Sequence, residues 1–362
     1  AQHIGYKGRP IACRQANREE FTAYANALKE LGKGCIELAL TNDVAIVDEK
    51  EYALLDLLLT ESSRPVTWLA LINRDDKPEA CQNTLRSTES LMKKGALPQV
   101  SCRPLIIQID LRVPFIFANL PCWKPAFQRP VEEQKQFYRD ANFRAAFRKE
   151  MESPKVFSGR WDRAVVHEVG NPAMRPLMGK TVAEIARERG KDGLDTFLDL
   201  AIEDDLQLQY TYELFNATEE RIPELITDPR VMIGLSDGGA HCDMLCDTGY
   251  CTYLLGTWVR ERSALTLEHA IKRLTAEPAA FYGIRERGTI TKGLAADFAI
   301  FDFNTVGSKK RGDMWNDLPG GGRRLVMPAR GVQYTVVNGA VLYEEGKHSG
   351  ALPGQVLRSG GL

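Results

Sequence analysis

The first hundred residues follow two hydrophobic periods in turn. Residues 18–31 carry Phe21, Tyr24, Leu28 and Leu31 at helical spacing, which predicts an amphipathic helix. Short apolar runs bounded by turn residues then alternate with longer helical patterns, which indicates a parallel sheet covered by helices. Strands are expected at residues 35–40, 66–72 and 99–104, and helices between them at residues 51–62 and 79–95.

Residues 112–160 interrupt this rhythm with aromatic residues, prolines and alternating charge, and residues 131–151 within them favour a helix. The large aromatic side chains of this insertion are Phe115, Phe117, Trp123, Phe127, Phe137 and Tyr138. Two interpretations stay open. These side chains pack the insertion against the helices that cover the sheet, or they cap an active-site mouth or dock on another chain.

Beyond the insertion, further strands are expected at residues 164–169 and 231–236, and helices at residues 181–189, 194–203 and 265–275. From residue 288 the pattern changes to short strands. Asn338-Gly339, flanked by two apolar runs, predicts a β-hairpin. We therefore divide the chain into an α/β domain over residues 1–285 and a small β-rich domain over residues 286–362.

Composition excludes several classes of function. The 362 residues carry a net charge of −1, which gives no reason to expect binding to nucleic acid or to an anionic membrane. No apolar run approaches the roughly 18 residues that span a bilayer. The eight cysteines have no framework spacing, which is typical of reduced thiols, so a cytoplasmic protein is expected.

The strongest candidate for chemistry follows the strand at residues 231–236, where Asp237 precedes two glycines and His241. A carboxylate at the C-terminal end of a buried strand lies where barrel enzymes hold their catalytic groups. The glycines allow a ligand to approach the backbone closely. The alternatives are a turn or helix cap for Asp237 and a backbone hydrogen bond for His241.

Four later segments, in this order and spacing, resemble the C-terminal third of the amidohydrolase superfamily. They are residues 274–284 (LTAEPAAFYGI), 288–302 (GTITKGLAADFAIFD), 336–343 (VVNGAVLY) and 349–354 (SGALPG). The last segment narrows the resemblance to the branch that includes D-aminoacylases (N-acyl-D-amino-acid deacylases). The resemblance is close over residues 160–358 and weaker over residues 9–112. It implies the C-terminal part of a (β/α)8 TIM barrel plus part of a small β-sandwich. The apolar strands expected above would supply about five of the eight strands of such a barrel.

The resemblance implies a role for Asp237, and the positions of His241, Arg103 and His167 in the sequence predict roles for them. Asp237 matches the carboxylate that binds a metal and acts as general base for the attacking water. His241 would bind the metal, orient Asp237 or contact the substrate. Arg103 would pair with a substrate carboxylate through its planar guanidinium, or belong to a structural salt bridge. His167 would face the barrel mouth and contact the substrate, or lie in the core.

The chain departs from the family pattern at the expected metal histidines. A His-x-His motif is absent from the sequence, whose five histidines are His3, His167, His241, His269 and His348. Residues 35–40 and 66–72, taken as the fifth and sixth barrel strands, are aliphatic where histidine is expected. We therefore expect a divalent metal, zinc, with some ligands outside this chain. A second polypeptide in a higher oligomer would carry the N-terminal half with the His-x-His motif.

These observations predict a metal-dependent hydrolase of a C–N bond in a small-molecule substrate: an amide, an imide or an N-acyl amino acid. Metal-activated water would attack the carbonyl carbon, and Asp237 would carry the proton. The alternative is a non-catalytic scaffold subunit that completes the barrel of a partner chain. The two differ in whether Asp237 contacts a metal.

Overall fold

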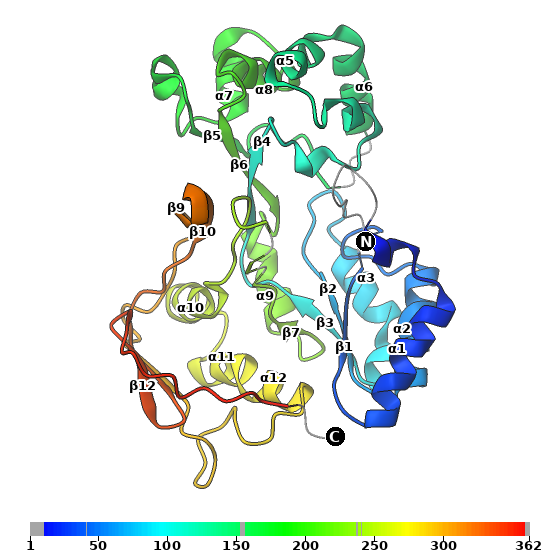
Figure 1. Ribbon diagram of the computed structural model, residues 1–362, viewed down its shortest axis with the longest axis vertical. Coiled ribbons are helices and arrows are strands. Elements are labelled where there is room, and N and C mark those ends of the chain that lie inside the picture. The colour runs from blue at the N-terminus through cyan, green and yellow to red at the C-terminus, as the bar shows by residue number, and fades with distance from the viewer. Residues whose placement is uncertain (1–10, 41, 153–155, 237, 240, 359–362) are drawn as a thin grey trace. The chain divides into compact units, whose positions relative to one another are not determined.

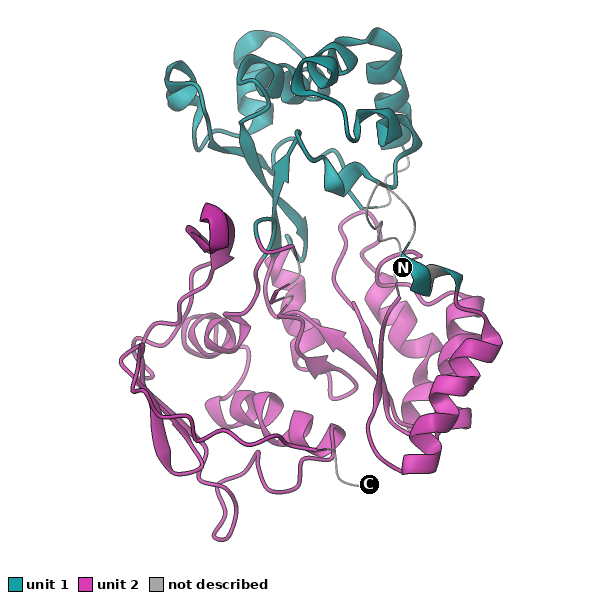
Figure 2. Ribbon diagram, in the orientation of Figure 1, with its two compact units in different colours: residues 1–15, 105–217, 243–245 teal, residues 16–104, 218–242, 246–362 magenta. Residues whose placement is uncertain are grey.

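The computed structural model describes residues 11–40, 42–152, 156–236, 238–239 and 241–358. These residues form two compact units, which Figure 2 shows in different colours. Unit 1 is built mainly from residues 105–217, together with residues 243–245 and the described residues up to 15. Unit 2 contains the described parts of residues 16–104, 218–242 and 246–362. Each unit has its own sheet and its own hydrophobic core.

A parallel sheet of four strands organises the first part of unit 2, in the order β1-β2-β3-β7. Its strands are β1 (Ile36–Ala39), β2 (Val66–Leu69), β3 (Ala96–Val100) and β7 (Met232–Ile233). Parallel neighbours need a crossover connection, which is usually a helix. The predicted alternation of strands and helices is thus confirmed for the first hundred residues.

Helices precede or connect these strands, and Figure 1 shows α1 and α2 side by side next to β1. They are α1 (Arg18–Leu31), α2 (Glu49–Ser62), α3 (Ala80–Ser87), α4 (Glu89–Lys93) and α9 (Ile222–Ile226). Helix α2 begins with a capping box: the Asp48 carboxylate accepts from the Glu51 amide, and the Glu51 carboxylate accepts from the Asp48 amide. Leu55 and Leu58 of α2 pack with Trp68 of β2 in one buried cluster. This cluster fixes the helix on the sheet.

The rest of unit 2 consists of helices followed by short strands. The helices are α10 (Tyr250–Tyr253), the π-helix η7 (Leu254–Glu261), α11 (Leu267–Leu274) and α12 (Ala276–Phe281). One sheet has the order β13-β12-β11-β8, from β8 (Phe298–Phe301), β11 (Val332–Val337), β12 (Ala340–Glu344) and β13 (Lys347–His348). A two-stranded sheet pairs β9 (Asp313–Leu318) with β10 (Gly322–Val326).

The hairpin predicted at Asn338-Gly339 is confirmed. Val337 pairs with Ala340 across the turn, and β11 and β12 run antiparallel. Asn338 and Gly339 both have positive φ, at 47° and 81°. Asparagine and glycine adopt that backbone conformation most readily, which explains the sequence signal.

Unit 1 contains an antiparallel sheet of three strands in the order β4-β6-β5. Its strands are β4 (Leu105–Asp110), β5 (Ala164–Glu168) and β6 (Gln209–Phe215), and its helices are α5 (Val131–Arg139), α6 (Ala141–Met151), α7 (Val182–Arg189) and α8 (Gly193–Glu203). The expectation that residues 164–169 extend the parallel sheet is wrong, because β5 pairs antiparallel with β6. Within the described part of the chain, four strands rather than about five therefore form the parallel sheet.

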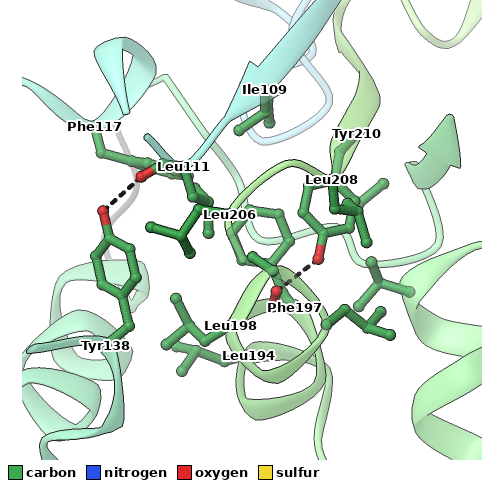
Figure 3. Close-up of a cluster of buried hydrophobic side chains, with 14 of the residues drawn as sticks. Ile109, Leu111, Phe117, Tyr138, Leu194, Phe197, Leu198, Leu206, Leu208 and Tyr210 are labelled. Carbon is green, nitrogen blue, oxygen red and sulfur yellow. Dashed lines mark hydrogen bonds between the residues drawn. The ribbon is translucent and has the colours of Figure 1, made fainter. Parts of the chain in front are cut away.

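The aromatic residues of the insertion lie inside unit 1 itself. Trp123 is 0% exposed, stacks on Phe117 at a centroid distance of 4.2 Å and meets Phe147 edge to face. Two buried tyrosines bond to backbone carbonyls: Tyr138 Oη donates to Leu111 O at 2.8 Å, and Tyr210 Oη to Phe197 O at 2.6 Å (Figure 3). Trp123 is therefore a core residue of this unit, and neither sequence interpretation described that arrangement.

The described part of residues 112–160 thus belongs to a larger unit, whose main segment runs from β4 to the end of β6. The proposed boundary at residues 285 and 286 falls within unit 2 and stays a prediction. Among the described residues, no helix combines the length and the apolar composition needed to cross a membrane.

Candidate active site

The carboxyl ends of parallel strands meet at one edge of a sheet, and barrel enzymes place their reacting groups there. Asp237 follows β7 at this edge in sequence, but it lies outside the described residues. The segment around it contains two strained positions, since Leu235 has φ 66° and the exposed His241 has φ 47°. Asp247 N donates to Ser236 O at 2.9 Å and so fixes the chain directly before Asp237.

One of the two glycines in this segment has a structural reason. A Cβ at Gly238 would lie 2.7 Å from Thr248 Cγ2, so the loop packs too closely for any larger residue. Gly239 has φ 90° and open space around its Cα. Both glycines therefore serve the backbone of the loop, whether or not a ligand approaches it.

The ends of β1 and β2 are joined by a network of charged side chains. The Arg74 guanidinium is buried and donates to Asp43, to Val44 O at 3.1 Å and to both carboxylate oxygens of Asp76, at 3.0 and 2.6 Å. Lys77 also donates to Asp43. Burial alone would raise the pKa of Asp43, but the hydrogen bonds from Lys77 and Arg74 outweigh it and lower that pKa. The carboxylate of Asp43 is therefore held in its charged form by two cations.

Arg103 follows β3 and is 0% exposed. Its guanidinium donates to Asp247 Oδ1 at 3.2 Å, to Ser308 Oγ at 3.1 Å, and to the backbone carbonyls of Lys309 and Lys310 at 3.1 and 2.7 Å. Its Cζ also lies 4.5 Å from the centre of the Tyr253 ring. This placement agrees with the structural alternative. A substrate-binding role for Arg103 stays a prediction that its contacts do not support.

His167 lies on β5 in the antiparallel sheet of unit 1 and is partly exposed. Its Nε2 is 3.8 Å from the Glu168 carboxylate. Arg103 and His241 belong to unit 2, so the structure does not join His167 to them in one described site. Its predicted contact with a substrate stays a prediction.

The described residues do not themselves provide a metal site. Among them, no three histidine, cysteine, aspartate or glutamate side chains gather closely enough to hold an ion. The β1–β2 edge instead pairs carboxylates with Arg74 and Lys77, whose cationic groups would repel a metal ion. A three-ligand metal site at this edge therefore needs at least one ligand from outside the described residues, and Asp237 is the candidate.

The sequence analysis did not predict the Arg74 network. The signal was present in Asn73-Arg74-Asp75-Asp76-Lys77, where charges of both signs follow an apolar strand directly. The burial of Arg74 depends on the loop after β1, which lies about thirty residues away in sequence.

Comparison with known proteins establishes the family. A family model described as "Amidohydrolase family" matches residues 142–343, which is more than half of the chain. The chain therefore belongs to the amidohydrolase family. The resemblance noted from the C-terminal segments is confirmed, and its D-aminoacylase branch recurs among the relatives.

The matches with curated relatives cover only part of each relative's length. The uncharacterized protein Rv2913c of Mycobacterium tuberculosis is 31% identical over 246 residues, which cover 63% of this chain and 39% of that protein. N-acyl-D-glutamate deacylase of Alcaligenes xylosoxydans xylosoxydans is 34% identical over 110 residues, or 30% of this chain and 20% of that protein. The chain thus spans well under half the length of these curated relatives.

Solved structures show the same fold. An N-acyl-D-glutamate deacylase from Bordetella bronchiseptica, in complex with zinc and a phosphonate inhibitor, has a TM-score of 0.53 at 19% identity. The similarity covers 96% of this chain and 60% of that chain. A D-aminoacylase mutant in complex with CuCl2 also has a TM-score of 0.53 at 19% identity, over 93% and 58% of the two chains. The chain therefore has the mixed α/β fold of these amidohydrolases.

Proposed function

We propose that this chain is the C-terminal part of a metal-dependent hydrolase that cleaves a C–N bond in a small molecule. The observation that carries the proposal is the family match over residues 142–343, which includes the Asp237 segment after β7. An amide, an imide or an N-acyl amino acid is the substrate class, and the D-aminoacylases among the relatives favour the last of these.

The reaction requires a base that also acts as an acid. Water adds to the carbonyl carbon, the C–N bond breaks, and a carboxylic acid and an amine are released. Asp237 takes a proton from the water and returns it to the departing nitrogen. The hydrogen bond from Asp247 N to Ser236 O holds the chain that carries this carboxylate, and His241 lies four residues further along the same loop.

A divalent metal, zinc, is part of this proposal, because amidohydrolase relatives bind zinc or copper in solved structures. The described residues lack a three-ligand group and the sequence lacks a His-x-His motif, so we propose that some ligands besides Asp237 come from polypeptide outside this chain. This assignment explains why the β1–β2 edge tolerates Arg74 and Lys77 where a metal site would require neutral or anionic ligands.

The parallel sheet also supports completion by another polypeptide. Within the described residues, β1 pairs only with β2, and β7 pairs only with β3, so both outer strands of the sheet have a free edge. Eight parallel strands close a barrel of this kind, and free edges invite pairing with another chain. We propose that a second polypeptide supplies the remaining strands and the His-x-His motif, and that the assembly is a higher oligomer in the cytoplasm.

The β-rich end of unit 2 offers a second place for this polypeptide. A cavity of about 920 Å³ lies between α11, α12 and β8, with Ile271, Tyr282, Phe298 and Phe301 in its wall. Within the described chain, β8 pairs only with β11, and Phe298 and Ile300 are exposed on it. An apolar strand with a free edge next to an apolar cavity suits an added strand of a β-sandwich.

Replacement of Asp237 by asparagine tests the proposed function. Asp237→Asn keeps the shape of the side chain and removes the base, so turnover of N-acetyl-D-glutamate by the assembled protein should fall roughly 10²–10⁴-fold. The melting temperature should stay nearly unchanged, because the substitution keeps the size and shape of the side chain. Asp243→Asn, an exposed aspartate of the same loop, is the control and should leave turnover unchanged.

The same experiment separates the alternative function. The absence of a three-ligand group among the described residues also suits a non-catalytic scaffold that completes a partner's barrel. A scaffold would tolerate Asp237→Asn, so turnover within about tenfold of the unmodified assembly would favour it. Loss of turnover with an intact assembly would exclude it.

A further inference from the structure

The antiparallel sheet of unit 1 has two faces of different character. One face belongs to the hydrophobic core and carries Ile107 and Ile109 of β4, Tyr210 and Tyr212 of β6, and Val166 of β5. Side chains alternate along a strand, so the residues between these point to the opposite face. That face is mostly polar and carries Gln108, Asp110, Gln209, Thr211 and Glu213.

Gln108 is the unusual residue on the polar face. It is 5% exposed, yet neither its Oε1 nor its Nε2 has a hydrogen-bond partner within the residues that the structure describes. Buried polar groups in native proteins nearly always have a partner, because an unpaired group loses its bonds to water without compensation. A buried and unpaired amide is therefore a position where a ligand or an ordered water can supply the missing hydrogen bonds.

Other glutamines show that this arrangement is specific to Gln108. Gln134, also in unit 1, is buried and donates to Arg112 O and Ala126 O at 2.9 and 3.0 Å. Gln209, on the same polar face, donates to Asp110 Oδ2 at 3.0 Å. Gln99 of unit 2 donates to Thr67 Oγ1 at 3.3 Å. Each of these three amides has a partner in the fold.

The neighbours of Gln108 define the chemistry of the position. Thr211 lies directly opposite on β6, so its side chain and that of Gln108 share the polar face as cross-strand neighbours. Gln108 N donates to Met244 O at 2.7 Å, so the backbone of β4 is fixed at this residue. The flanking Ile106, Asp110 and Glu213 are only partly buried, and a rotamer change of Gln108 would bring its amide toward them.

We propose that Gln108 and Thr211 form a binding site for an amide group of a small molecule. A carboxamide has one acceptor oxygen and two N–H donors, so it pairs with a ligand amide through a donor and an acceptor at once. A carboxylate ligand offers acceptors only and would leave Gln108 Oε1 unpaired. The proposal deepens the proposed function and rests on it in one respect, since an amide is the bond that the assembled protein would cleave.

Binding of N-acetylglycinamide, which carries amides and no charge, tests this site on the full chain by isothermal titration calorimetry. The unmodified protein should bind the probe, and acetate at the same concentration should bind at least about tenfold more weakly. Gln108→Leu should weaken probe binding by about tenfold or more. The same substitution should leave the melting temperature unchanged or raise it, because it replaces an unpaired buried amide by an apolar group of similar size.

Gln209→Leu is the matched control on the same face. It removes a glutamine that already has a partner, so it should lower the melting temperature slightly and leave the affinity for the probe within about twofold. The proposal is overturned if the unmodified protein does not bind the probe, or if Gln108→Leu leaves the affinity unchanged. A clear fall in melting temperature for Gln108→Leu would also overturn it, because that result assigns Gln108 a structural bond to ordered water.

Turnover and probe binding keep the two proposals apart. If Asp237→Asn remains active while the probe binds through Gln108, the proposed function is overturned and the amide site stands. If Asp237→Asn abolishes turnover while the probe does not bind, the amide site is overturned and the proposed function stands.

Discussion

The parallel sheet of unit 2 and the antiparallel sheet of unit 1 each bury a glutamine, but the side chains have different surroundings. Gln99, in the parallel sheet of unit 2, donates to Thr67 Oγ1. Gln108, in the antiparallel sheet of unit 1, has no partner for its amide within the described residues. The same contrast extends to arginines at the strand ends of unit 2, since Arg74 and Arg103 are each bound by several acceptors. Polar groups of the described parallel sheet are committed to the fold, whereas one group of the antiparallel sheet is not.

This difference shows where new chemistry should be sought. A buried guanidinium with several acceptors stabilises its surroundings and is not available for a ligand without breaking them. An amide that the fold leaves unpaired is available for a ligand. Its burial without hydrogen bonds lowers the stability of the fold, and that loss needs an explanation. We therefore assign a structural role to Arg74 and Arg103 at the strand ends of unit 2. To Gln108 on the sheet of unit 1 we assign a role in binding.

The largest expected effect concerns the aromatic core of unit 1. Trp123→Ala removes a side chain that is 0% exposed and touches Phe117, Phe143 and Phe147. It should lower the free energy of unfolding by roughly 3–5 kcal/mol, measured by urea denaturation. An unchanged stability with a raised KM would contradict the core assignment and restore the interpretation of Trp123 as a residue of a lid.

Replacement of Arg103 tests whether the unit 2 strand end is structural. Arg103→Met removes one partner of a buried ion pair and leaves Asp247 without its guanidinium, so the loss should be about 3 kcal/mol in the same assay. Arg148→Met is the matched control, because the exposed Arg148 pairs with Asp192 and Asp195 and should contribute less than about 1 kcal/mol. Equal losses of unfolding free energy in the two variants would contradict the assignment of a larger structural role to the buried Arg103 than to the exposed Arg148.

The two buried glutamines of unit 1 give a direct comparison. Gln134→Leu leaves the carbonyls of Arg112 and Ala126 without their donor and should cost about 1–3 kcal/mol of stability. Gln108→Leu should cost nothing. Thermal unfolding of both variants side by side measures the difference. A loss of similar size in both would mean that Gln108 has a partner in solution.

The smallest effect is the pH dependence of the Asp43 network. The pKa of Asp43 is lowered in the folded protein, so the carboxylate contributes stability above its unfolded pKa of about 3.9 and loses it as the pH falls through the folded value. The stability difference between the unmodified protein and Asp43→Asn should be about 1 kcal/mol or less, constant from pH 7 to pH 5, and should shrink below about pH 4. Denaturant titrations across this range measure it, and a difference that grows in acid would contradict the assigned charge state.

Local patterns made part of the fold predictable. The helix at residues 18–31, the strands of the parallel sheet and the Asn338-Gly339 hairpin follow from signals within about fifteen residues of one another. The antiparallel sheet of unit 1 was not predicted, because β4 pairs with β6 about a hundred residues later and periodicity carries no information on such pairing. Residues 164–169 were correctly predicted as a strand because their local pattern indicates one. That local pattern does not show which strand they pair with, so their sheet was not predicted.

The candidate site was also predictable only where local sequence determines it. Asp237 and His241 were selected because a carboxylate and a histidine follow an apolar strand, and that order is visible in the sequence. The burial of Arg74, Arg103 and Gln108 depends on side chains brought in from distant segments, such as Asp247 and Lys310 around Arg103. The sequence therefore does not show whether an arginine after a strand binds a substrate or an internal carboxylate.

The central proposal is that this amidohydrolase chain does not complete a metal site by itself, since its described residues contain no group of three ligands. The zinc content of the purified 362-residue chain, after incubation with zinc and dialysis under reducing conditions, tests it most directly. We expect the chain alone to retain well under about 0.1 zinc per molecule, since tight structural and catalytic sites need three or four protein ligands. Retention of about one zinc per isolated chain, lost in Asp237→Asn, would contradict the claim and would mean that this chain alone supplies the ligands.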